Sequence, residues 1–178
     1  LFLGWERWGN VYKYIVDSHN FITNKYKFKN KMCAMVLDIF NYIHNPWTQV
    51  LKGKRILIIS SFIESIKEKI NIRKEIYGVD LFPECSFVFA KPPQTQGLIR
   101  SEDYYKELEP FLKKLDTLKN DFDIALVSCG GYGNIVTNYI YEMGNSAIYV
   151  GGALQMYFGI YGGRYMRERS DILKLYLN

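Results

Sequence analysis

The alternation of short apolar runs with helix-like stretches constrains this chain more than any other feature of its sequence. Four runs rich in Ile, Val and Ala lie at residues 55–59, 86–90, 123–128 and 146–150. Such runs are typical of strands that are buried on both faces of a parallel sheet. Amphipathic stretches separate them, which predicts βαβ units with right-handed crossovers. We therefore expect an α/β fold, a Rossmann-like and mostly parallel sheet of four or more strands flanked by helices.

The residues before the first strand have a helical pattern. Apolar side chains recur at helical spacing in residues 11–21 and 31–43, and Asn45-Pro46 is expected to end the second helix. The sequence thus predicts one domain over residues 1–178, with a helical segment at 1–50 and a core at 51–165. Since the chain begins with Leu1, we expect it to be a fragment of a larger polypeptide, whose other domains are candidate partners.

The stretches between the strands carry start and stop signals for helices. The first runs from Ser60-Ser61 to about Tyr77, and the second from Ser101, a candidate cap, to about residue 120. The third spans residues 135–143 and is stopped by Gly144. Residues 153–178 are expected to form short helices that pack across the edge of the sheet.

Charge and cysteine usage narrow the class of protein. Lys and Arg number 23 against 18 acidic residues, and this net charge of +5 favours anionic ligands such as nucleotides. The basic residues are scattered, so nucleic acid is not an expected partner. Cys33, Cys85 and Cys129 lack metal-ligand spacing, as do His19 and His44, which predicts reduced thiols and a cytoplasmic protein. No apolar run approaches the roughly 20 residues of a membrane span.

Four segments follow the predicted strands and are expected to converge. Ligands of open parallel sheets bind beyond the carboxyl ends of the strands. This rule selects residues 60–64, 91–96, 130–134 and 151–155 as one candidate rim. Their convergence predicts a binding site more strongly than any one segment does.

The turn Cys129-Gly130-Gly131-Tyr132-Gly133-Asn134 stands between a strand and a helix. Glycines allow a ligand to approach the backbone, and the helix start offers free N–H groups to a phosphate. The alternative is a tight turn without a ligand. The turn is a poor dinucleotide fingerprint, because Val136 stands where a third glycine would be and no acidic residue ends the next strand. The missing carboxylate also argues against S-adenosylmethionine.

Two other rim segments have open interpretations. Ser60 or Ser61 either caps the following helix, with Glu64 returning the bond, or binds a phosphate or sugar, with Glu64 as general base. The loop after the second strand is either a linker or a binding loop in which Lys91 pairs with a diphosphate and Gln94 or Gln96 contacts a base or sugar.

The stretch after the fourth strand is the least ordinary one. Gly151-Gly152 is followed by apolar and aromatic residues, among which Gln155 and Arg164 are not explained by a core. Arg164 is flanked by glycines, as suits an anionic ligand. Asp121-Phe122-Asp123 has the spacing of a metal motif, but it precedes the third strand and should lie away from the rim.

The run DIALVSCGGYGNIVTNYIYEMGNSAIYVGGALQMYFGIYGGR, residues 123–164, is similar to the second half of the glycosyltransferase D-type fold (GT-D) family. NPWTQVLKGKRILIISSFIESI and FVFAKPPQTQG resemble its middle portion, so the resemblance covers about residues 45–165. It implies sugar transfer from a nucleotide sugar, often with a divalent metal, in a pocket lined by residues 130–134 and 151–155. The Asp-x-Glu motif of that family is absent from this chain.

These observations predict a glycosyltransferase that moves a sugar from a nucleotide-sugar donor to a glycan acceptor. Glu64 is the candidate catalytic base, and Mn or Mg is the expected cofactor, with no ligand residues identifiable in this chain. The predicted donor-binding residues are Ser60, Ser61, Lys91, Gln94, Gly130, Gly131, Tyr132, Gly133, Asn134, Gly151, Gly152, Gln155 and Arg164. The alternatives are an S-adenosylmethionine-type methyltransferase-like domain and a non-catalytic nucleotide-binding or interaction domain of a larger enzyme.

Overall fold

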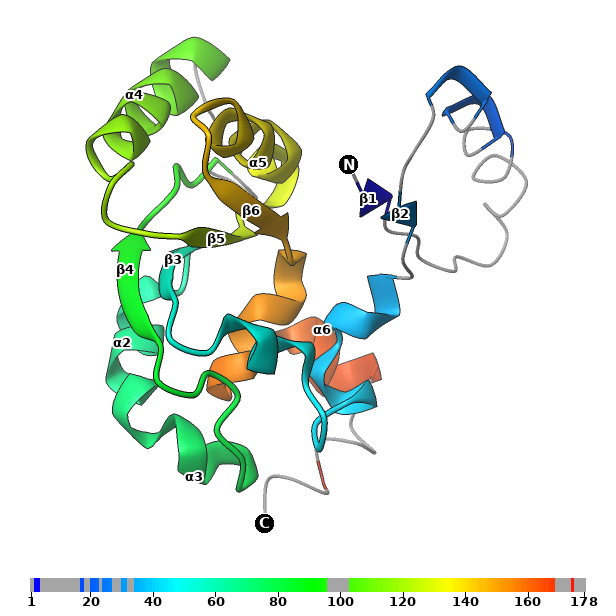
Figure 1. Ribbon diagram of the computed structural model, residues 1–178, viewed down its shortest axis with the longest axis vertical. Coiled ribbons are helices and arrows are strands. Elements are labelled where there is room, and N and C mark those ends of the chain that lie inside the picture. The colour runs from blue at the N-terminus through cyan, green and yellow to red at the C-terminus, as the bar shows by residue number, and fades with distance from the viewer. Residues whose placement is uncertain are drawn as a thin grey trace. The chain divides into compact units, whose positions relative to one another are not determined.

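The chain divides into two compact units, Leu1–Tyr42 and Ile43–Asn178, and each is described by itself. The computed structural model describes residues 2–3, 17, 20–22, 24–26, 30–31, 34–95, 103–168 and 174 (Figure 1). No helix within these ranges is long and apolar enough to cross a bilayer.

In the first unit, the described residues 17, 20 and 21 of the predicted helix 11–21 are helical, whereas residues 31–43 do not form one helix. Strand β1 (Phe2–Leu3) pairs in parallel with β2 (Asn30–Lys31), and two 3-10 helices follow at Ala34–Leu37 and Ile39–Asn41. The prediction of one helix over residues 31–43 is therefore wrong. Asp38 has an extended backbone between the 3-10 helices, and its carboxylate accepts a 3.1 Å hydrogen bond from Phe40 N. This local capping interrupts the helical pattern. Most of the predicted helix at residues 11–21 lies outside the described residues.

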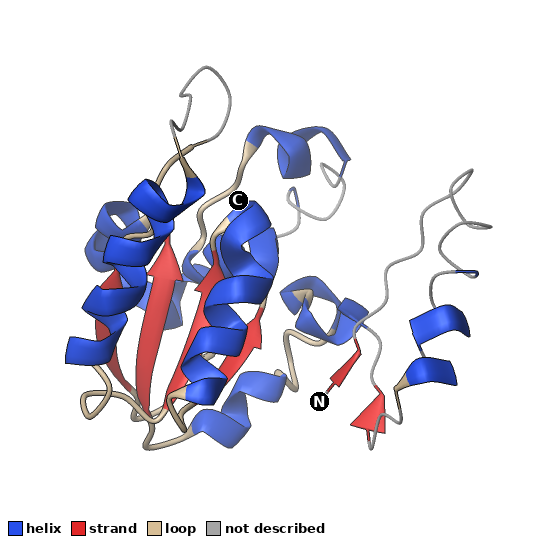
Figure 2. Ribbon diagram, turned by 90° about the horizontal axis from the view of Figure 1, so that it is seen from above, coloured by secondary structure: helices blue, strands red, loops and turns tan. Residues whose placement is uncertain are grey.

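The second unit is built on a four-stranded sheet. Its strands are β3 (Arg55–Ser60), β4 (Ser86–Ala90), β5 (Ile124–Ser128) and β6 (Ser146–Tyr149). Their order in space is β4-β3-β5-β6, and every pair is parallel, as the arrows of Figure 2 show. The Rossmann-like α/β fold is confirmed, and each predicted strand matches an observed one to within a residue at either end.

Helices cover both faces of this sheet. Helices α4 (Tyr104–Thr117) and α5 (Gly133–Glu142) pack on one face, where strand residues such as Leu57 and Val127 form a fully buried cluster with Leu108 and Val136. Neighbouring strand residues point to the opposite face. There α2 (Ile63–Lys69), α3 (Arg73–Tyr77) and the 3-10 helix Gly151–Phe158 complete the second layer (Figure 1).

The helix limits differ from the predicted ones at several points. The helix predicted from Ser60 to Tyr77 is broken by a 3-10 turn at Ile70–Ile72. Helix α4 is capped by Asp103, whose carboxylate accepts a 2.9 Å bond from Tyr105 N, and Ser101 lies outside the described residues. Short helices after β6 are confirmed as the 3-10 helix and α6 (Gly163–Glu168).

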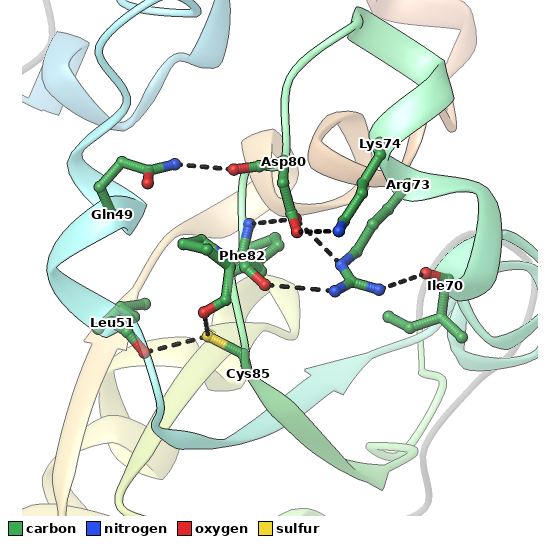
Figure 3. Close-up of polar contacts among 9 residues, drawn as sticks. Gln49, Leu51, Ile70, Arg73, Lys74, Asp80, Phe82 and Cys85 are labelled. Atoms are coloured by element: carbon green, nitrogen blue, oxygen red, sulfur yellow. Dashed lines mark hydrogen bonds and ion pairs between the residues drawn. The ribbon is translucent and has the colours of Figure 1, made fainter.

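The loop leading into β4 is held by polar contacts at the amino end of the sheet (Figure 3). Arg73 Nε donates to Asp80 Oδ1 at 3.2 Å, and these two side chains are only 18 % and 17 % exposed. Gln49 Nε2 donates to the Asp80 carbonyl at 2.7 Å, and Cys85 Sγ donates to the Leu51 carbonyl at 3.0 Å. The loop is thereby tied to the segment that precedes β3 and to α3.

Candidate functional site at the carboxyl edge of the sheet

The four predicted rim segments follow the carboxyl ends of four parallel strands. Residues 60–64 begin with the last residue of β3, and residues 91–95, 130–134 and 151–155 follow β4, β5 and β6. The carboxyl ends of parallel strands share one edge of a sheet, which is the upper edge in Figure 2. The segments that the sequence selected therefore lie along the same rim, apart from Gln96, which is outside the described residues.

The glycine turn after β5 begins with a special backbone conformation. Gly130 has φ +55°, a left-handed value that favours glycine, and it starts the 3-10 helix Gly130–Tyr132 that leads directly into α5. Cys129, just before the turn, is buried, and desolvation raises the pKa of its thiol to about 11. The thiol is thus protonated at neutral pH, which is the less reactive form of cysteine.

Tyr149, the last residue of β6, supplies a contact that sequence reasoning missed. Its hydroxyl donates to the Gly130 carbonyl at 2.9 Å. A Cβ built on Gly133 would overlap the Tyr149 ring, so a side chain at position 133 fits only if this ring moves. The sequence signals this contact only by placing an aromatic residue, Tyr149, at the end of the strand that follows the helix beginning at Gly133.

Gly131 and Gly152 differ from the other rim glycines. Both are exposed, and neither has a positive φ. Within the described structure, a Cβ added to either one meets no atom within 4 Å. Gly151, by contrast, has φ +66°. Neither conformation nor packing therefore requires glycine at positions 131 and 152, which lie in the turns after two adjacent strands.

A pair of hydroxyl groups links the loops after β4 and β5. Thr95 Oγ1 lies 2.8 Å from the Tyr132 hydroxyl, and either can be the donor. Because β3 stands between β4 and β5, this bond joins the two loops that flank the end of β3. In the same loop Lys91 is exposed, whereas Gln94 Nε2 donates to the carbonyls of Pro92 and Pro93. The hydrogen bonds of the Gln94 amide nitrogen are thus made within its own loop.

The serines after β3 do not form the predicted capping box. Ser60 is fully buried, and its Oγ accepts a 3.2 Å bond from Phe62 N, two residues on. Phe62 occupies the N-cap position of α2 without a side-chain cap, and Ser61 is half-buried. Glu64 is exposed and pairs with Lys67 Nζ at 3.4 Å. The predicted capping box, in which Glu64 would return the hydrogen bond of the serine, is therefore wrong. The Glu64 carboxylate faces solvent.

The last predicted donor-binding residues follow β6. Gln155 is only 7 % exposed, and a Cβ on Gly162 would stand 3.0 Å from its Nε2. The missing side chain of Gly162 thus makes room for this amide. Arg164 lies on α6, and its side chain is outside the description. Asn134, on the first turn of α5, is exposed.

The Asp121-Phe122-Asp123 motif lies at the opposite, amino end of the sheet, as predicted. Asp123 Oδ2 accepts from Arg55 N and Oδ1 from Arg55 Nη2, both at 2.8 Å. The hydrogen bonds from Arg55 lower the pKa of the Asp123 carboxyl group. The Asp123 carboxylate thus links the amino ends of β3 and β5 through its hydrogen bonds to Arg55.

The described residues do not contain a group of three or more His, Cys, Asp or Glu side chains that would hold a metal ion. Comparison of the chain with protein-family models, with curated proteins and with solved structures found no match.

Proposed function

We propose that this chain is the nucleotide-sugar-binding part of a glycosyltransferase that passes a sugar to a glycan acceptor. Two observations support the proposal. The first is the Rossmann-like sheet with four loops on its carboxyl edge, where ligands of such folds bind. The second is the resemblance of about residues 45–165 to the GT-D family.

The observation that carries the proposal is the pair of unexplained glycines, Gly131 and Gly152. They lie beyond the adjacent strands β5 and β6, are exposed, and have no atom of the described residues within 4 Å of the place that a side chain would take. Exposed positions without a need for glycine usually carry side chains, since glycine costs about 0.5–1 kcal/mol in chain entropy. A ligand that contacts the backbone at both turns would explain why positions 131 and 152 are glycine.

The turn after β5 offers the chemistry that a nucleotide-sugar leaving group needs. A diphosphate gains negative charge as the sugar departs, and backbone N–H groups at the start of α5 are suited to stabilise that charge. Lys91, exposed in the loop after β4, adds a cation at the same edge. Glu64 is proposed to accept the proton of the acceptor hydroxyl, since its carboxylate is exposed after β3. No step is assigned to a metal ion.

Calorimetric titration of the purified chain with a panel of nucleotide sugars, with and without Mn²⁺ or Mg²⁺, tests the proposal. We expect at least one to bind, and we expect Gly131→Ala and Gly152→Ala to weaken that binding about tenfold or more. The melting temperature of both variants should be unchanged or slightly raised, because the added methyl groups enter open space. Ser86→Ala, at the exposed amino end of β4, is the control and should bind as the parent does.

The outcomes separate the alternatives. Glu64→Gln should keep donor binding and lose transfer. If no nucleotide sugar binds or is hydrolysed, the proposal is wrong. Binding of S-adenosylmethionine instead would favour the methyltransferase-like alternative, whereas a bound nucleotide with unaffected Gly131→Ala and Gly152→Ala variants would remove the observation that carries the proposal.

A further inference from the structure

Tyr149 is an exposed aromatic residue among the rim glycines. Its side chain reaches from the end of β6 to the turn after β5, where its hydroxyl bonds the Gly130 carbonyl and its ring packs on Gly133. A Cβ on Gly151 would stand 4.0 Å from Tyr149 Cζ. Three glycines thus surround a side chain that is still 36 % exposed.

These contacts hold the ring in a defined place. The hydrogen bond fixes the hydroxyl end, and the close approach of Gly133 restricts the ring on one side. An aromatic ring that is already ordered loses little conformational entropy when a ligand packs on it. The exposed part of the Tyr149 ring is therefore a preorganised surface at the edge where ligands of this fold bind.

The two chain segments that meet at the ring carry no charged residue. The sequence has no Asp, Glu, Lys or Arg from Met143 to Gly163, and the turn 129–135 has none either. A charged group placed on the ring would have no ion-pair partner in these two turns. A neutral planar ring is suited to such a surface, because it stacks on an aromatic face without needing one.

We propose that Tyr149 is a stacking platform for the nucleobase of a bound nucleotide. This inference rests on the proposed function and adds the position of the base: it lies on Tyr149, beside the turns that carry Gly131 and Gly152. The diphosphate then extends from the base toward the start of α5. The hydroxyl of Tyr149 keeps its bond to Gly130, so the ring alone contacts the base.

Calorimetric titration with UDP, GDP, ADP and CDP, and with inorganic pyrophosphate as a probe that lacks a base, tests the platform. For the nucleoside diphosphate that binds the parent chain, Tyr149→Leu should weaken binding about 5- to 100-fold, the range of base–aromatic stacking. Tyr149→Phe keeps the ring and should remain within a few-fold of the parent. Tyr141→Leu, which changes an exposed tyrosine near the far end of α5, is the matched control and should have no effect.

A second measurement reports on stacking directly. The base protons of the bound nucleotide should shift upfield in proton NMR spectra with the parent chain and Tyr149→Phe, and this shift should be lost with Tyr149→Leu. Unchanged nucleotide affinity in Tyr149→Leu overturns the platform while leaving the proposed function intact. An equal loss of pyrophosphate and nucleotide binding also overturns it, because Tyr149 would then act by holding the glycine turn. If no nucleoside diphosphate binds the parent chain and no nucleotide sugar does so, the proposed function and the platform fail together.

Discussion

Replacing Gly133 by alanine tests how the turn after β5 is built. The new Cβ would overlap the ring of Tyr149, whose carbon atoms lie closer to that position than any real Cβ contact allows. The ring must move, and its hydroxyl then loses the 2.9 Å bond to the Gly130 carbonyl. The change is therefore expected to destabilise the protein, although alanine is ordinarily the better helix former.

The size of the effect is the balance of three contributions. Displacing a packed ring costs about 1–3 kcal/mol, and losing the hydrogen bond costs about 1 kcal/mol. Alanine offsets part of this cost, because it lowers the conformational entropy of the unfolded chain and so stabilises the protein by about 0.5–1 kcal/mol. The free energy of unfolding should thus fall by about 2 kcal/mol, which lowers the melting temperature of a domain of this size by about 4–8 °C.

Urea and thermal unfolding of a double-mutant cycle measure this prediction. Gly131→Ala is the matched control, two positions away in open space, and should cost nothing. In a Tyr149→Ala background Gly133→Ala should instead stabilise the protein by about 0.5–1 kcal/mol, since the obstructing ring is gone. The coupling energy is then about 3 kcal/mol. The explanation is refuted if Gly133→Ala is as stable as Gly131→Ala, or if its cost is the same with and without the ring.

Three further predictions concern the scaffold. Arg55 lowers the pKa of Asp123, so the stability advantage of the parent over Asp123→Asn should be complete near pH 7 and lost as the pH falls through the lowered pKa, as unfolding at a series of pH values will reveal. Arg73→Met should cost about 1 kcal/mol in urea unfolding, because Asp80 loses its half-buried partner but keeps Lys74 Nζ and Phe82 N; an unchanged midpoint would contradict this. With its pKa near 11 and its side chain buried, Cys129 should resist iodoacetamide at pH 8 until the protein unfolds, as mass spectrometry of digested samples can establish.

The strands were predictable because the signal for them is local. A strand buried on both faces of a parallel sheet must be apolar along its whole length, and residues 56–59 and 125–127 satisfy this without reference to the rest of the chain. The parallel order then follows from the intervening helices, and the shared rim follows from the parallel order. The sequence therefore also located the candidate site at the carboxyl edge.

The helices were less predictable because their limits depend on competing local contacts. The apolar spacing of residues 31–43 is helical, yet the Asp38 carboxylate caps a short 3-10 helix instead. The helix after β3 is divided by a 3-10 turn at Ile70–Ile72, where the spacing of apolar residues gave no warning. Periodicity reports which face is buried, but it does not report whether the backbone is continuous.

Within the candidate site, the sequence determined that a glycine-rich turn stands between a strand and a helix, and only the tertiary structure decided what each glycine is for. Gly130 has a left-handed backbone, Gly133 makes room for Tyr149, and Gly131 has neither a positive φ nor a described neighbour where its side chain would be. These roles depend on β6 lying beside β5, which brings a tyrosine from a later strand against the start of α5. A sequence lists its glycines by position, whereas the need for glycine is set by atoms that the fold brings within a few ångströms.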